Sequence, residues 1–135
     1  MSVETEAYLR LFSEGFSAGN LAVVDELVSP DYQTHQRGLS HGPDGVKAVI
    51  LQLRKWFADF TLTPQAIVQD GDTVWGRNKG RGTNTGSVLG HPPSGVQVEV
   101  DVVDIIRFRD GKMVEHWGVP DQLGMMEQVG VFPKR

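Results

Sequence analysis

The periodicity of apolar residues changes once along this chain, near residue 60, and that change limits the folds it can adopt. Before this point apolar residues recur every three or four positions, and after it they alternate with polar residues. Strands that follow helices as a group are typical of α+β domains, in which helices pack on one face of an antiparallel sheet. The 135 residues suit one such domain, spanning 1–135.

Three helices are expected in the first part of the chain. The first spans about 3–18 and ends at Gly19, and the second follows Asn20, a suitable cap, and ends before Pro30. A short extended segment covers 31–35. The third helix spans about 43–57, because Pro43 suits a first turn and the clearest apolar stripe of the chain follows it.

Four strands are expected after the change, at about 60–70, 73–85, 96–109 and 113–119, with a short helix at 122–128. Gly76, Gly80 and Gly82 share one side of the second strand, which predicts a sharp bend or a close approach by another segment. A change in apolar parity predicts a β-bulge at 102–104. We expect a curved antiparallel sheet wrapped around the helices, forming a cone-shaped, cystatin-like barrel whose apolar interior can hold a small ligand.

Composition excludes several function classes. The formal net charge of −4 leaves no cationic surface for a nucleic acid. The absence of cysteine excludes disulfides and thiolate catalysis, and the four histidines lack metal-ligand spacing, so we expect no metal. The acidic N-terminus has no apolar core, and no apolar run approaches the ~20 residues of a membrane helix. We therefore expect a cytoplasmic protein that does not act at a membrane.

Asp121 is the first candidate for acid/base chemistry. In an extended chain it shares a face with Trp117 and Val119. A carboxylate partly desolvated beside an indole is a stronger base near neutral pH. The alternative is that Asp121 only caps the C-terminal helix.

Further candidates could shape the same pocket. Asp104 lies in an apolar stretch, where a carboxylate must find a partner or face a cavity, and the suspected bulge leaves both directions open. His35 is either a structural hydrogen-bonding group or part of the site. Trp75 either lines the interior or fills it. His116 adjoins Trp117, so we expect these two side chains on opposite faces of the last strand.

Several short segments, taken in order and spacing, resemble the SnoaL-like polyketide cyclase (ester cyclase) family over essentially the whole chain. They are Gly71-Asp72-Thr73-Val74, Gly82-Thr83-Asn84-Thr85-Gly86, Gly90-His91-Pro92-Pro93-Ser94-Gly95, Ile106-Arg107-Phe108-Arg109-Asp110-Gly111-Lys112, Glu115-His116-Trp117 with Asp121, and Gln128-Val129-Gly130. The family shares a cone-shaped α+β fold with ketosteroid isomerases and nuclear-transport-factor-like proteins. Two positions depart from the common pattern, Ala58 in place of proline and Ser94 in place of threonine.

The resemblance implies a cyclase that uses neither metal nor cofactor and closes a ring by intramolecular aldol condensation of a polyketide ester. The family's catalytic aspartate follows the Glu-His-Trp motif and matches Asp121, which would remove the proton between two carbonyls and later protonate the new oxygen. The implied ligand is a small apolar or aromatic carbonyl compound. The residues expected to shape or polarise its site are His35, Trp75, Asp104 and Trp117.

Other functions remain open from the sequence. The same cone could be a non-catalytic domain that binds a small ligand or dimerises. A homodimer through the exposed sheet face, with Val103 and Ile105 supplying apolar area, is expected for this fold. An epoxide hydrolase would need an Asp-Arg-Asp cluster, for which Asp104 and Arg107 are the available residues.

Overall fold

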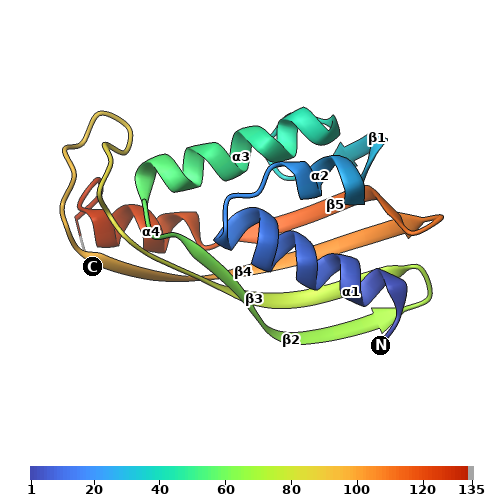
Figure 1. Cartoon of the computed structure of the whole chain (residues 1–135). Helices are drawn as coiled ribbons and strands as arrows, with labels where there is room; N and C mark the ends of the chain where they lie inside the picture. Colours follow the sequence, from blue (N-terminus) through green and yellow to red (C-terminus); the bar gives the residue numbers. More distant parts are fainter. Residues whose placement is uncertain (134–135) are drawn as a thin grey trace.

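The computed structural model describes residues 1–133 and confirms the α+β class. The elements run in the order α1 (Val3–Arg10), η1 (Leu11–Ser17), α2 (Ala22–Leu27), β1 (Val28–Thr34), α3 (Gly42–Trp56), β2 (Thr61–Asp70), β3 (Thr73–Thr83), β4 (Gln97–Arg109), β5 (Lys112–Pro120) and α4 (Gln122–Val129). Helices α1, α2 and α3 cover one face of the curved sheet, and α4 lies at one end of it, beside the β3–β4 loop (Figure 1).

The sheet is mixed and open, with strand order β1-β5-β4-β3-β2. Strands β2 to β5 pair antiparallel with their neighbours, whereas β1 pairs parallel with β5. The expected α+β cone with a curved sheet over the helices is confirmed, and it differs from an antiparallel barrel in two respects. The short segment after α2 forms a strand beside β5, and β1 and β2 remain at opposite edges, so the sheet curves without closing.

The bend of β3 depends on glycine. A side chain at Gly76 would collide with the Tyr8 hydroxyl of α1, and one at Gly82 would collide with Phe57. The predicted close approach is confirmed. These glycines let α1 and the end of α3 pack directly on the backbone of the sheet, which draws the helices over its inner face.

The expected bulge at 102–104 is wrong. β3 and β4 pair without interruption from Thr73 opposite Arg107 to Thr83 opposite Gln97. Val103 and Ile105 belong to the outer face, while the even-numbered residues from 98 to 108 face inward. The apparent change of parity arose because this strand carries apolar side chains on both faces. Register shifts occur instead in the β2–β3 pairing and at Arg107–Phe108, opposite β5.

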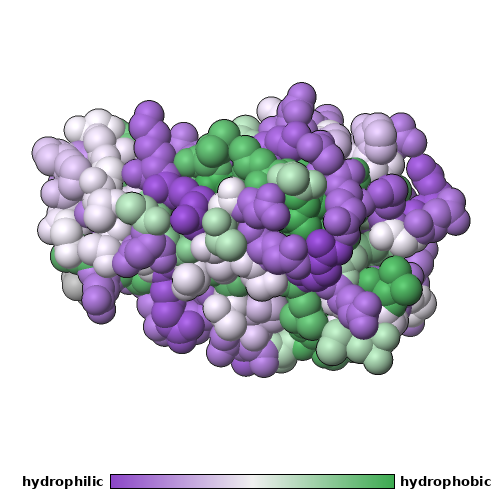
Figure 2. Space-filling model, viewed as in Figure 1, coloured by the Kyte–Doolittle hydropathy of each residue, from purple (hydrophilic) through white to green (hydrophobic). Residues whose placement is uncertain are grey.

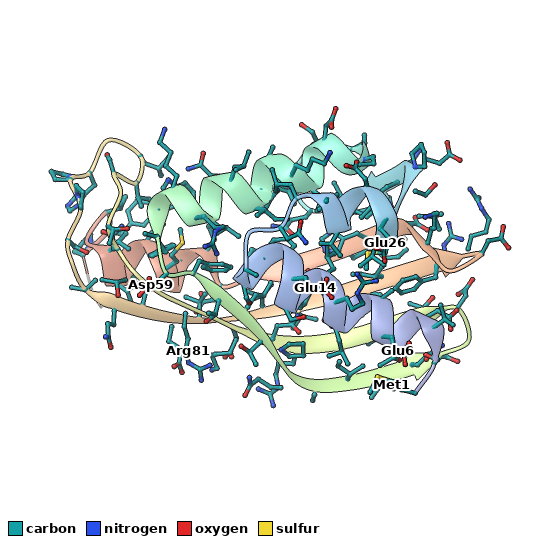
Figure 3. All side chains as sticks on the ribbon, viewed as in Figure 1. Met1, Glu6, Glu14, Glu26, Asp59 and Arg81 are labelled. Atoms are coloured by element: carbon teal, nitrogen blue, oxygen red, sulfur yellow. The ribbon has the colours of Figure 1, made fainter. Side chains whose placement is uncertain are left out.

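The first predicted helix divides into α1 and a π-helical segment, η1. Ser2 caps α1 by accepting the Thr5 N–H at 3.0 Å. Arg10 at the end of α1 pairs with Glu14 of η1 and Glu26 of α2, and Figure 3 shows the two glutamates on neighbouring helices. Leu11 and Phe12 of η1 are buried.

The core lies between the helices and the inner face of the sheet, where Tyr8, Ile50, Ile106 and Met113 are fully buried. The side of the molecule that carries the helices is mixed in character, with apolar atoms gathered over α3 between hydrophilic ones (Figure 2). No helix within residues 1–133 is long and apolar enough to cross a membrane.

Candidate active site

A cavity of about 820 Å³ lies between the helices and the inner face of the sheet. Its wall is mainly apolar. It includes Leu11, Phe12 and Phe16 of η1, Val46, Val49 and Leu53 of α3, and Val98, Val100, Val102 and Ile106 of β4. Cavities of this size and character bury most of a small, fused-ring molecule.

Asp104 is the carboxylate held inside this cavity. Its residue is 6% exposed, and both of its oxygens are hydrogen-bonded. His116 Nε2 lies 2.7 Å from Oδ1, and the Asn78 amide donates to Oδ2 at 2.9 Å. A carboxylate can remain charged in an apolar interior when such partners compensate it. Of the two directions left open by the sequence, the Asp104 side chain therefore takes the one that faces the cavity.

Asn78 is oriented by a second contact. The Tyr8 hydroxyl donates to Asn78 Oδ1 at 2.9 Å, so the amide presents its N–H to Asp104. Burial, and then the negative charge of Asp104, raises the pKa of Tyr8 above its usual range. Tyr8 therefore stays protonated and remains a donor.

His116 is oriented from its other side. Thr34 Oγ1 lies 2.8 Å from His116 Nδ1 and also accepts the Gln36 backbone N–H at 3.2 Å. Because the oxygens of a carboxylate only accept, His116 carries a proton on Nε2 and donates it to Asp104 Oδ1.

Tyr32 completes the surroundings of this pair. Its ring stacks on the His116 ring at 6.2 Å between centroids. Its pKa is raised, first by burial and second by the charge of Asp104. The hydroxyl is therefore neutral at physiological pH.

Asp121 occupies a different environment. It is the N-cap of α4, where Oδ1 accepts the Gly124 N–H at 2.9 Å, and it is exposed at the rim of the cavity. The expectation that it is desolvated beside Trp117 is wrong, because Trp117 and Val119 point to the outer face of β5. The capping alternative describes its local structure, and its role as acid or base stays a prediction.

His35, Trp75 and Trp117 lie on the outer face, so their expected position in the pocket is wrong. Trp75 and Trp117 are 50% and 37% exposed, and the His35 ring stacks on Trp117 at 4.9 Å. The predicted separation of His116 and Trp117 is confirmed, but the histidine is the one that faces inward. The reason is that long-range partners compensate the imidazole there.

Arg107 also lies on the outer side, where its Nε donates to Glu115 Oε1 at 2.8 Å. Glu115 additionally contacts His35 Nε2 at 2.7 Å. Asp104 and Arg107 therefore face opposite sides of β4, and the cluster needed for the epoxide hydrolase does not form.

Sequence reasoning missed Asn78, Thr34, Tyr8 and the inward direction of His116. One signal was available for Asn78, which is the single amide on the glycine-bearing side of β3, with Gly76, Gly80 and Gly82. Within residues 1–133 no group of three or more His, Asp or Glu side chains could hold a metal ion.

Residues 6–129 match the family model for SnoaL-like polyketide cyclase. The chain belongs to the SnoaL-like polyketide cyclase family. Nogalonic acid methyl ester cyclase of Streptomyces nogalater is 27% identical over 85% of this chain and 89% of its own length. Aklanonic acid methyl ester cyclase DnrD of Streptomyces peucetius is 26% identical over 96% of this chain and 92% of its own length.

A solved structure shows the same fold. Wild-type IdmH from Streptomyces antibioticus superposes with a TM-score of 0.84 and 33% identity, covering 94% of this chain and 98% of that one. The relatives' names place this SnoaL-like chain in a family of cyclase-type enzymes.

Proposed function

We propose that the protein is a polyketide cyclase that needs no cofactor and uses Asp104 as its acid/base group. The observation that carries the proposal is the position of this carboxylate, which is buried in the wall of the cavity and held by His116 and Asn78. A carboxylate in such a place can exchange a proton with a bound ligand while water is largely excluded.

The proposed reaction is an intramolecular aldol condensation. Asp104 takes a proton from a carbon between two carbonyls, and the C–H electron pair moves into the enolate. The enolate carbon attacks a ketone carbonyl of the same molecule, which forms the new C–C bond and leaves an alkoxide. Asp104 then returns its proton to that oxygen. No atom enters or leaves, so the product is an isomer of the substrate.

His116 and Asn78 serve this cycle by holding Asp104 in one orientation. A carboxylate has about four lone-pair sites, so two hydrogen bonds leave it able to accept a further proton. The His116 Nε2 donor also stabilises the charge that returns to Asp104 when the product is protonated.

The substrate class follows from the cavity and from the relatives. An apolar space of about 820 Å³ suits a planar, fused-ring compound better than a sugar or a free amino acid. Two relatives are named as cyclases of nogalonic and aklanonic acid methyl esters. We propose an aromatic polyketide ester of that kind.

The test compares Asp104→Asn with Asp121→Asn, because Asp121 at the rim is the competing candidate. Each purified protein is incubated with aklanonic acid methyl ester and with nogalonic acid methyl ester, and the isomeric product is separated by chromatography. Asp104→Asn is expected to lower kcat/KM by about 10³-fold, and Asp121→Asn by only a few-fold. The reverse order would assign the base to Asp121. Saturable binding of both esters without turnover by the wild type would favour a non-catalytic binding domain.

We also propose that the outer sheet face joins two copies of the chain. Trp75, Ile105 and Trp117 lie side by side across β3, β4 and β5, and Val103 is opposite Val119 one row away. Exposed tryptophan and valine side chains grouped in this way favour burial against an apolar partner. Sedimentation velocity at micromolar concentration should show a dimer for the wild type and a monomer for Trp75→Lys. A wild-type monomer would contradict this proposal.

A further inference from the structure

The inner face of β5 has a gap opposite Asp104, and a glutamine side chain fills it. Gly118 is the register partner of Asp104 across the β4–β5 pair, so the two residues lie directly opposite on neighbouring strands. A side chain at Gly118 would collide with Gln36 Oε1 and would come within 2.7 Å of His116 Cε1. The Gln36 amide therefore rests on the bare Gly118 backbone, beside the Asp104–His116 pair.

The backbone at Gln36 is fixed to the same pair. The Gln36 N–H donates to Thr34 Oγ1, the hydroxyl that contacts His116, and the N–H of His35 donates to the His116 carbonyl at 2.8 Å. The His35 bond holds this segment against β5, and the Gln36 bond ties the segment to the Thr34 side chain that contacts His116. The Gln36 backbone is thus linked to Asp104 through the side chains of Thr34 and His116.

The Gln36 amide has hydrogen-bonding capacity to spare. Its residue lines the cavity, and among residues 1–133 its side-chain nitrogen and oxygen have no hydrogen-bond partner. The polar side chains that form the hydrogen-bond network of Asp104 are His116, Asn78, Thr34 and Tyr8, and each is committed to it. The nearby Tyr32 hydroxyl has Thr34 as its partner. A neutral amide in the cavity wall, resting on Gly118 directly across from the base, can offer its N–H to a substrate carbonyl.

We propose that the Gln36 side-chain amide binds the substrate carbonyl next to the carbon from which Asp104 takes the proton. When the C–H bond breaks, negative charge develops on this oxygen, and the amide N–H donates to it without forming a covalent bond. This inference rests on the proposed function of Asp104. It also gives Gly118 a role, because a larger residue there would displace the amide.

The first test is Gln36→Leu, which replaces the amide by a branched apolar side chain one atom shorter and removes the donor. Its matched control is Gln33→Leu, on the exposed side of β1. With aklanonic acid methyl ester, Gln36→Leu is expected to lower kcat by about 10- to 100-fold with a smaller change in KM, because the hydrogen bond strengthens as charge develops. Gln33→Leu should match the wild type. Thermal unfolding checks that both variants are folded.

A second test uses Gly118→Ala, alone and combined with Gln36→Leu. If the glycine acts only by admitting the amide, the double variant should lose no more activity than Gln36→Leu alone. A Gln36→Leu variant with wild-type kcat would overturn the inference. The two proposals can fail separately. If the Asp104→Asn variant is inactive and the Gln36→Leu variant is fully active, only the role of Gln36 is overturned. A fully active Asp104→Asn overturns the role of the base itself.

Discussion

Two histidine–carboxylate pairs involve consecutive residues of β5 and lie on opposite faces of the sheet. His116 contacts Asp104 on the inner face, and Glu115 contacts His35 on the outer face, each across 2.7 Å. The side chains of the inner pair are 9% exposed, whereas those of His35 and Glu115 are 45% and 23% exposed. The distance is the same, and only the surroundings differ.

The surroundings decide what each pair can do. In the single chain water screens the outer pair, and exposed pairs of this kind contribute little to stability. The inner pair lies in a medium of low dielectric constant, where an unpaired charge is costly and an oriented one can act on a bound ligand. An equal contact distance therefore does not imply equal importance, and burial on the cavity side is the reason for proposing that the inner pair carries the chemistry.

The largest difference between the two faces should appear in catalysis. His116→Phe removes the donor to Asp104 and should lower kcat/KM for aklanonic acid methyl ester by about 10²-fold or more. His35→Phe keeps the stacking on Trp117 and should change it less than about 2-fold. Steady-state assays measure both variants, and equal losses of kcat/KM would contradict the claim that only the inner face takes part in catalysis.

The next difference should appear in stability. Asn78→Leu leaves the Tyr8 hydroxyl and one oxygen of Asp104 without their partner, and should lower the free energy of unfolding by about 2–3 kcal/mol. Arg81→Leu is the outer-face control. This side chain points away from the helices and pairs with Glu99 while 48% exposed (Figure 3), so its loss should cost less than about 1 kcal/mol. Urea unfolding measures both, and a larger loss for Arg81→Leu would contradict the account.

The smallest expected effect is the pH dependence of the stability that Glu115 of the outer pair contributes. The contacts with His35, and then with Arg107, hold the pKa of Glu115 below its usual range. A carboxylate whose pKa is lower in the folded state contributes stability above its unfolded pKa, and that contribution is lost as the pH falls through the folded value. The stability gap between the wild type and Glu115→Gln should therefore narrow as the pH falls from 7 to below about 4. Urea midpoints at several pH values give this gap, and a gap that widens in acid would show the opposite sign.

The sequence allowed the elements to be predicted because their signals are local. Apolar stripes, capping residues and turn residues predicted the four α-helices and four long strands of residues 1–133 close to where they occur. The glycines of β3 also predicted the close approach of another segment, which is α1 at Gly76. The parallel pairing of β1 with β5 could not be predicted, since it joins segments about 80 residues apart and has no local signature.

The candidate site shows the same limit. Local hydropathy favours Trp117 over His116 as the inward residue of β5. The observed choice is reversed because Asp104 and Thr34, which lie 12 and 82 positions from His116, compensate its ring. The candidate aspartates were both visible in the sequence, but only the folded chain distinguishes the buried one from the helix cap.

Deuterium exchange tests the central claim, that the inner-face carboxylate Asp104 removes the proton, because it isolates this step from ring closure. Aklanonic acid methyl ester is incubated in D₂O with the wild type, Asp104→Asn or Glu115→Gln, and deuterium entering the carbon between two carbonyls is followed by mass spectrometry above the uncatalysed rate. The account predicts enzyme-dependent exchange with the wild type and with Glu115→Gln, and none with Asp104→Asn. Exchange by Asp104→Asn at the wild-type rate would contradict it.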